Sequence, residues 1–107
     1  MPRMWMTAPD KMCRKHLVAE HHECHVFAGR VLKGMPLGGY LAANLLEPSA
    51  LEARHDELVA EMLRRGYKHG SPFPTIEITE ATTIDRDAVR EELLRRCPEC
   101  RKLHGEE

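Results

Sequence analysis

The chain has 107 residues, of which 31% are charged and 42% hydrophobic, and its formal net charge is −1. This composition is typical of a globular protein, and the length fits one domain spanning residues 1–107. The near-neutral balance argues against a strong non-specific nucleic-acid binder, which is usually basic. No apolar run approaches the ~20 residues of a membrane span, and no signal-peptide pattern opens the chain. We therefore expect a cytoplasmic protein with no membrane partner and with reduced cysteines.

The first third of the chain predicts an extended arm followed by a long helix. Residues 1–11 contain Pro2 and Pro9 and lack helical periodicity, so Trp5 is expected to anchor this arm to the body. A helix is expected from about Asp10 to Leu32. Its apolar stripe includes Glu20, and a carboxylate buried there needs a partner, for which His16 is the nearest candidate. The stripe runs through Cys13, Leu17, Glu20, Cys24, Phe27 and Val31.

The rest of the chain predicts three further helices, one of them short. After a glycine- and proline-rich break, residues 40–46 form an apolar short helix, and a capping box at 49–52 opens a second long helix that ends at Gly66. Residues 75–79 are expected to be extended chain. Asp85 caps the last helix, with Ile84 and Val89 placed for a hydrophobic staple, and Pro98 stops or kinks it. The sequence thus predicts an all-α, compact single domain of three main helices, a short helix and an extended N-terminal arm.

Two residues near the start have the chemistry of a nucleophile and an acid. If Met1 is removed, Pro2 becomes a secondary amine, and an α-amine has a pKa of about 7.7–8, so much of it is neutral near pH 7. Such an amine can attack the anomeric carbon of a sugar and form an iminium. Glu23 lies three residues after Glu20. When two carboxylates lie close together, their repulsion raises the pKa of one of them. The alternatives are that Pro2 is an ordinary second residue and that Glu23 lies on a solvated helix face.

Several histidines and cysteines have spacings found in metal sites. His21 and His25 are four residues apart, but no third ligand is evident near them. Near the C-terminus, a C-x2-C-x3-H pattern lacks a fourth ligand unless Cys13 or Cys24 supplies one. Structural zinc and buried free thiols both remain open for this pattern, and no cofactor is expected. The pattern consists of Cys97, Cys100 and His104.

The first third also carries a surplus of positive charge. Six basic residues face three acidic ones between Met1 and Met35, which leaves three net positive charges. Ordinary surface charge and contacts to nucleic-acid phosphates explain this surplus equally well. The candidate contacts to phosphate are Arg3, Arg14, Lys15, His22, Arg30 and Arg54.

Two segments resemble a known family. Residues 15–23 (KHLVAEHHE) are similar to the first-helix motif of the pyrimidine-dimer DNA glycosylases of the bacteriophage endonuclease V type, and residues 57–67 (ELVAEMLRRGY) are similar to the second long helix of that family. The resemblance implies a compact all-α glycosylase with apurinic/apyrimidinic (AP) lyase activity, which acts as a monomer on damaged double-stranded DNA and needs no metal.

Carried over by position, the resemblance implies roles for individual residues. Pro2 takes the place of the N-terminal nucleophile and Glu23 that of the catalytic carboxylate. Arg3 and His22 match DNA-contacting positions of the family and His25 lies near one; together with His16, Arg30 and Arg54 they make up the expected DNA-binding residues. The chain departs from the family in a shorter segment around 34–48, in Cys97-Pro-Glu-Cys100 replacing an aromatic C-terminal stretch, and in histidines replacing arginines. The lesion therefore stays open between a pyrimidine dimer, another modified base and an abasic site.

Two rival functions also follow from the sequence. One is a non-catalytic helical DNA-binding module, held together by zinc at Cys97 and Cys100. The other is a metal-dependent hydrolase that uses His21 and His25.

Overall fold

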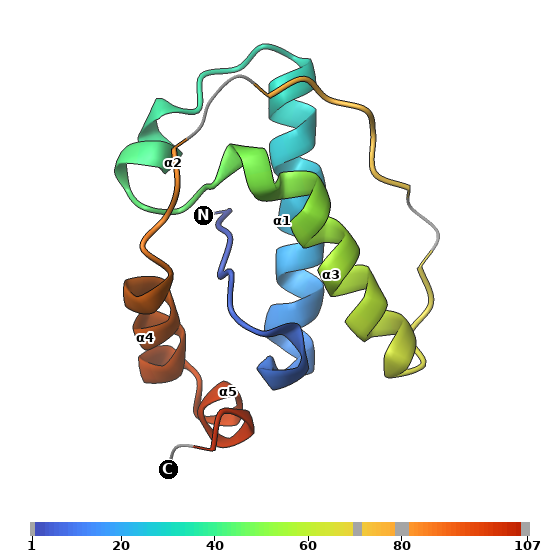
Figure 1. Ribbon diagram of the computed structural model, residues 1–107, viewed down its shortest axis with the longest axis vertical. Helices are drawn as coiled ribbons and strands as arrows, with labels where there is room; N and C mark the ends of the chain where they lie inside the picture. Colours follow the sequence, from blue (N-terminus) through green and yellow to red (C-terminus); the bar gives the residue numbers. More distant parts are fainter. Residues whose placement is uncertain (1, 70–71, 79–81, 106–107) are drawn as a thin grey trace.

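The computed structural model describes residues 2–69, 72–78 and 82–105, and the regular elements in these ranges are all helices (Figure 1). The prediction of an all-α protein with three main helices is confirmed. The α-helices are α1 (Arg14–Leu32), α2 (Gly38–Ala42), α3 (Leu51–Arg64), α4 (Arg86–Arg96) and α5 (Pro98–Leu103). Two short 3₁₀ turns, η1 (Pro9–Lys11) and η2 (Pro48–Ala50), precede α1 and α3.

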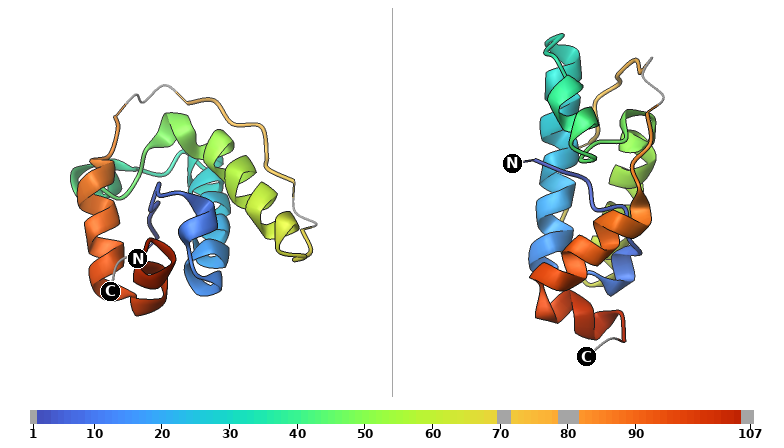
Figure 2. Two further views of the ribbon diagram at one scale, coloured as in Figure 1. Left: turned by 60° about the horizontal axis from the view of Figure 1, so that its bottom comes forward. Right: turned by 90° about the vertical axis from the view of Figure 1, so that its left-hand side faces the viewer.

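The core lies between the crossing pair α1 and α3 on one side and α4 with α5 on the other. The N-terminal arm runs between these two halves, and Figures 1 and 2 both show it flanked by α1 and α4. Its Met4 and Trp5 belong to the same buried cluster as Leu17 of α1, Leu58 of α3 and Leu93 of α4. The expected anchoring of the arm through Trp5, which is 5% exposed, is therefore confirmed.

Glu20 is fully buried, as its place on the apolar stripe predicts, but its partner is not His16. Arg54 of α3 donates from Nε and Nη2 to the two carboxylate oxygens of Glu20, at 2.6 and 2.9 Å. Arg54 Nη2 also donates to the Met12 sulfur at 3.4 Å. This bidentate pair crosses the α1–α3 interface, and two charges buried together need such geometry to offset their desolvation.

Several helix boundaries differ from the sequence-based expectation. The first helix begins at Arg14 rather than near Asp10, because Pro9 opens a 3₁₀ turn and Met12 and Cys13 are extended. The short helix is Gly38–Ala42 instead of 40–46, since Asn44 adopts a left-handed backbone with φ of 61°. The expected capping box at 49–52 does not form, because residues 48–50 make η2 and the α3 N-cap is Ala50 without a side-chain bond.

The last helices follow the predicted signals more closely. The Asp85 side chain accepts a bond from the Ala88 N–H, and the flanking Ile84 and Val89 are both buried. Pro98 ends α4, but it also opens α5, which the sequence did not predict. Proline suits the first position of a helix because its missing N–H would have no partner there.

The segment between α3 and α4 is extended where it is described. Residues 72–78 form no strand, and Ile76 and Ile78 pack against the core, as expected of extended chain lying on the helices. The expected segment reached residue 79, which lies outside the described residues. None of the helices in the described ranges has both the length and the apolar character that a membrane crossing requires.

Candidate functional site

The start of the arm is fixed in place by buried contacts. Met4 is fully buried, and its N–H donates to the Leu45 carbonyl oxygen at 2.8 Å. The Met4 sulfur accepts a bond from the Glu47 N–H at 3.4 Å. Because these contacts hold Met4, only two residues after Pro2, the start of the chain has a defined position in the fold.

Glu23 of α1 lies directly beside this chain start. The Arg3 N–H donates to Glu23 Oε2 at 2.7 Å. Since consecutive Cα atoms are about 3.8 Å apart, Pro2 is the immediate neighbour of the residue that binds the carboxylate. Glu23 is half-buried, and this burial raises its pKa; the bond from Arg3 opposes the rise and the nearby Glu20 adds to it. The arrangement places a carboxylate with a raised pKa next to Pro2.

The Arg3 guanidinium forms no ion pair with any residue that the structure describes. Its guanidinium lies over the Trp5 ring at 3.9 Å, and its Nε is buried with no hydrogen-bond partner in the described part of the chain. Burial and then the charge of Arg96 lower the pKa of Arg3. Arg3 and Arg96 line a cavity of about 240 Å³ together with Asn44. Glu92 also lines this cavity and pairs with Arg96 at 2.5 Å, so an anion such as phosphate would bind there chiefly through the Arg3 guanidinium.

Arg96 was not anticipated from the sequence. It sits in the last turn of α4, more than 90 residues from Arg3, and α4 carries several other arginines with the same local pattern. Only the tertiary packing distinguishes Arg96 from its neighbours.

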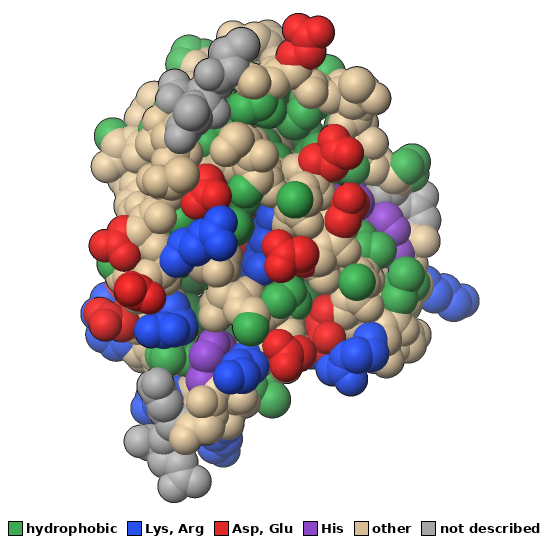
Figure 3. All heavy atoms as spheres, viewed as in Figure 1, with side chains coloured by type: hydrophobic (Ala, Val, Ile, Leu, Met, Phe, Trp, Pro, Cys, Tyr) green, Lys and Arg blue, Asp and Glu red, His purple; other side chains and the backbone are tan. Residues whose placement is uncertain are grey.

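The exposed side of α1 carries a basic ridge beside Glu23. Arg30 follows Glu23 by seven residues, which is about two helical turns, so both lie on one side of the helix. The Arg30 guanidinium lies over the Tyr40 ring at 5.1 Å. We define the basic ridge as Lys15, His22, Arg30 and Lys33, of which all but the partly exposed Arg30 are exposed. By contrast, the face in Figure 3 mixes basic and acidic side chains and shows no continuous basic surface.

Three residues expected to contact DNA have other surroundings. Arg54 is 2% exposed and is bound to Glu20, so a phosphate cannot reach it and the expectation is wrong. His16 lies among cysteine sulfurs, with its Nδ1 3.2 Å from Cys13 Sγ. His25 lies among other histidines, with its Nε2 buried. Both histidine positions favour a role inside the protein over a DNA contact.

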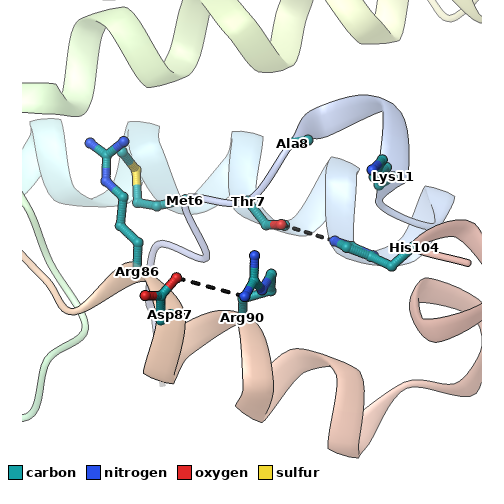
Figure 4. Close-up of a pocket in the computed structure, with 8 residues that line it drawn as sticks. All are labelled: Met6, Thr7, Ala8, Lys11, Arg86, Asp87, Arg90 and His104. Atoms are coloured by element: carbon teal, nitrogen blue, oxygen red, sulfur yellow. Dashed lines mark hydrogen bonds and ion pairs between the residues drawn. The ribbon is translucent and has the colours of Figure 1, made fainter. Parts of the chain in front are cut away.

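A separate pocket opens on the side of the arm that faces α4 and α5 (Figure 4). It has a volume of about 200 Å³ and includes neither Arg3 nor Glu23. In its wall His104 contacts Thr7 Oγ1 through Nε2 at 3.0 Å and the Cys100 carbonyl oxygen through Nδ1 at 2.8 Å. Because both ring nitrogens of His104 are engaged, the expectation that it completes a site with Cys97 and Cys100 is not supported.

Among the residues that the structure describes, two groups of side chains have ligand atoms close enough to hold a metal ion, within 4.8 Å of one another in each group. The thiolate cluster consists of Cys13, His16, Cys97 and Cys100, and the histidine cluster consists of His21, His25, His55 and His69. The sequence pointed to parts of both, but His55 and His69 were missed, because no local spacing connects them to α1. Cys24 belongs to neither cluster; it is buried, and burial raises the pKa of its thiol.

The comparison with protein families identifies a related family. A family model described as pyrimidine dimer DNA glycosylase matches residues 3–75, which is about two thirds of the chain. The matched range contains the arm from Arg3 on, α1 with Glu23, and α3. No curated protein and no solved structure matches the chain.

Proposed function

The chain belongs to the pyrimidine dimer DNA glycosylase family, and from this premise we propose that it is a DNA repair glycosylase with AP lyase activity. In this proposal the amine of Pro2, freed by removal of Met1, is the nucleophile and Glu23 is the acid–base and electrostatic partner. The observation that carries the proposal is the 2.7 Å bond from the Arg3 N–H to Glu23, which keeps the chain start beside the carboxylate.

The proposed reaction begins at the sugar of the damaged nucleotide. The Pro2 nitrogen attacks C1′ while the bond between C1′ and the base breaks, and the base leaves with the bonding electrons and takes up a proton. The amine loses its proton and the sugar ring opens, which gives an iminium at C1′. The Glu23 carboxylate stabilises this positive charge at short range.

Strand cleavage follows from the same intermediate. A proton leaves C2′, and its electron pair forms a double bond to C3′ as the 3′ phosphate departs. The iminium withdraws electrons throughout, so the chemistry does not call for a metal ion. Hydrolysis of the iminium then releases the amine for another turnover.

The surfaces around Glu23 support binding of the DNA backbone. The basic ridge flanks Glu23 on α1, and the cavity beside it presents the Arg3 guanidinium, which has no ion-pair partner among the described residues, whereas Arg96 is paired with Glu92. Reaching C1′ in a duplex requires that a nucleotide be extruded from the stack. We propose damaged double-stranded DNA as the partner, with a pyrimidine dimer as the first substrate to test and a monomeric protein as the active form.

Borohydride trapping tests the nucleophile. Untagged protein is incubated with duplex DNA carrying a thymine dimer or an abasic site, and borohydride reduces any iminium to a stable adduct. We expect an adduct whose mass includes the chain without Met1, joined through Pro2 in peptide mapping. A variant with an N-terminal extension should give no adduct. An adduct on a lysine, or an equal yield from the extended variant, would refute the role of Pro2.

Substitution of the carboxylate tests the second role. The Glu23→Gln variant keeps the shape and an oxygen acceptor for the Arg3 N–H but loses the charge. It should bind the DNA as the wild type does and cleave it at least 100-fold more slowly, because a general acid–base or charge-stabilising group is worth about 10²–10⁴-fold. DNA binding without cleavage in the wild type as well would instead favour the non-catalytic binding module.

A further inference from the structure

We propose that the thiolate cluster is a structural zinc site that joins α1 to the C-terminal helix pair. Its four residues come from two places far apart in the sequence: Cys13 and His16 at the start of α1, and Cys97 and Cys100 at the start of α5. Three thiolates and one imidazole form a donor set that Zn²⁺ takes in closed structural sites.

The distances within the thiolate cluster fit one tetrahedral ion. Cys13 Sγ lies 3.8 Å from Cys97 Sγ and 3.2 Å from His16 Nδ1, and Cys100 Sγ lies 3.8 Å from His16 Nδ1. With zinc–sulfur bonds of about 2.3 Å, the sulfurs of a tetrahedral site lie about 3.8 Å apart. A disulfide needs the two sulfurs at about 2.05 Å, so the Cys13–Cys97 pair is too far apart to be one.

The backbone around the thiolate cluster supplies donors to the sulfurs. The Cys100 N–H points to Cys97 Sγ at 3.4 Å, and the Cys13 N–H points to Cys100 Sγ at 3.3 Å. Such outer contacts orient metal ligands and offset thiolate charge. Cys13 and Cys97 are each the N-cap of the helix that carries the next ligand, so C-x2-H and C-x2-C present their side chains from the same kind of turn.

Zinc bound here would also steady the N-terminal arm. Trp5 packs edge-on against the His16 ring, with centroids 5.7 Å apart, and the Arg3 guanidinium lies over the Trp5 ring. The cluster therefore supports the N-terminal arm through the contact between His16 and Trp5.

Metal analysis of the untagged full chain tests the thiolate site. After dialysis against a weak chelator, the Cys97→Ser/Cys100→Ser variant should hold one equivalent of zinc fewer than the wild type, and the control Cys24→Ala should hold as much as the wild type. Wild-type protein reconstituted with Co²⁺ should show thiolate-to-cobalt charge transfer, a readout that survives if the double variant fails to fold. Unchanged zinc in a folded double variant, or cobalt protein without this absorption, would overturn the proposal.

The histidine cluster carries a second and independent inference. Its four rings come from α1, α3 and the segment after α3, with neighbouring ring centroids 4.7–5.3 Å apart. All four Nε2 atoms are buried and have no hydrogen-bond partner among the described residues. Leaving a buried polar atom without a partner costs about 1–3 kcal/mol, so four such atoms facing one another call for something that binds them all.

We infer that the ligand shared by these four imidazole nitrogens is a divalent transition-metal ion, with Zn²⁺ as the first candidate. Neutral imidazole suits zinc, and small side-chain rotations bring atoms within 4.8 Å to the roughly 3.4 Å edges of a tetrahedral nitrogen site. His55 also has its Nδ1 3.1 Å from the Asp56 carboxylate, the outer contact that fixes the tautomer of a metal-bound histidine. Phe73 covers the cluster, with its ring centroid 4.8 Å from that of His55.

The same zinc assay separates the two clusters. The His25→Gln/His69→Gln variant should lose one equivalent of zinc and keep the cobalt–thiolate absorption, whereas His22→Gln, an exposed position on α1, should lose none. Native mass spectrometry of the wild type should show two zinc ions per chain. A wild-type chain with a single zinc ion, all of it lost with Cys97 and Cys100, would overturn the inference and leave buried water as the partner of the histidines.

Discussion

At the scale of single residues, the Glu20–Arg54 pair shows what sequence reasoning resolves and what it does not. The apolar spacing of α1 placed Glu20 in the interior, and the structure confirms this. The spacing could not identify Arg54 as the partner, because Glu20 and Arg54 are 34 positions apart and lie on different helices. A buried charge predicts that a partner exists; the fold decides which one it is.

Breaking this pair from one side should destabilise the protein strongly. Arg54→Met leaves the Glu20 carboxylate buried without a partner, and such changes cost about 3–5 kcal/mol of unfolding free energy. The double variant Glu20→Leu/Arg54→Met removes both charges and should recover most of the loss. Urea unfolding followed by circular dichroism measures both values. Equal losses in the single and the double variant would show that packing, and not the unpaired charge, is responsible.

The half-buried Glu23 carboxylate is predicted to lower the stability of the folded protein at neutral pH, although activity requires it. Its pKa is raised above the ordinary value of a glutamate, mainly by burial. The folded state therefore holds its proton more tightly than the unfolded state, and stability falls as pH rises from the unfolded pKa to the folded one. At neutral pH the Glu23→Gln variant should melt at a temperature no lower than the wild type, and the difference should shrink below the unfolded pKa. A lower melting temperature at pH 7 would show that the Arg3 bond outweighs the desolvation.

At the scale of elements, the sequence predicted helices better than their junctions. The apolar spacing of α1, α3 and α4 was sufficient because each helix buries one stripe. The junctions were harder because Pro9 and Pro98 act in two ways: each ends one conformation and opens another, a 3₁₀ turn or α5. The candidate site followed the same rule. Glu23 was found from a motif within one helix, whereas the positions of Arg96, of His55 on α3 and of His69 after α3 depend on how the chain packs.

The junction between η1 and α1 depends on Arg65, the residue that directly follows α3. Arg65 donates to the Pro9 and Met12 carbonyl oxygens at 3.1 and 2.7 Å and pairs with Glu61 at 2.6 Å. Arg65→Ala should lower the unfolding free energy by about 1.5–3 kcal/mol, the range for hydrogen bonds to charged groups. Arg64→Ala is the control, because that side chain is 64% exposed and binds Glu61 but neither of the two carbonyl oxygens at the junction. Denaturant unfolding that gives equal losses for both would contradict the role of Arg65.

The Glu61 carboxylate adds a pH dependence to this junction. Its bonds from Arg64 chiefly, and from Arg65, lower its pKa to about 2. A depressed pKa gives stability that is present above the unfolded value and lost as pH falls toward the folded one. The Glu61→Gln variant should therefore be less stable than the wild type at pH 7 and approach it as pH falls toward 2. A constant difference across pH 2–7 in thermal unfolding would refute this assignment.

At the scale of the whole molecule, the net charge of −1 is an average over surfaces that differ in charge. The basic ridge and Arg3 lie around Glu23, while the face in Figure 3 mixes both signs. A DNA-binding mode that uses one side of α1 should engage few phosphates. Around Glu23, four cations have no ion-pair partner among the described residues, and they set the expected number of phosphate contacts. These cations are Arg3, Lys15, Arg30 and Lys33.

This number predicts the salt dependence of DNA binding. Each neutralised phosphate contributes a slope of about −0.9 to log K against log salt concentration, so four contacts give about −3.6. Arg30→Ala should weaken binding and reduce the slope by about 0.9, whereas Arg64→Ala on α3 should leave the slope unchanged. Fluorescence anisotropy with abasic-site duplex at several salt concentrations measures these slopes. Should Arg64→Ala reduce the slope as much as Arg30→Ala does, the DNA would lie across α3 rather than along the basic ridge beside Glu23.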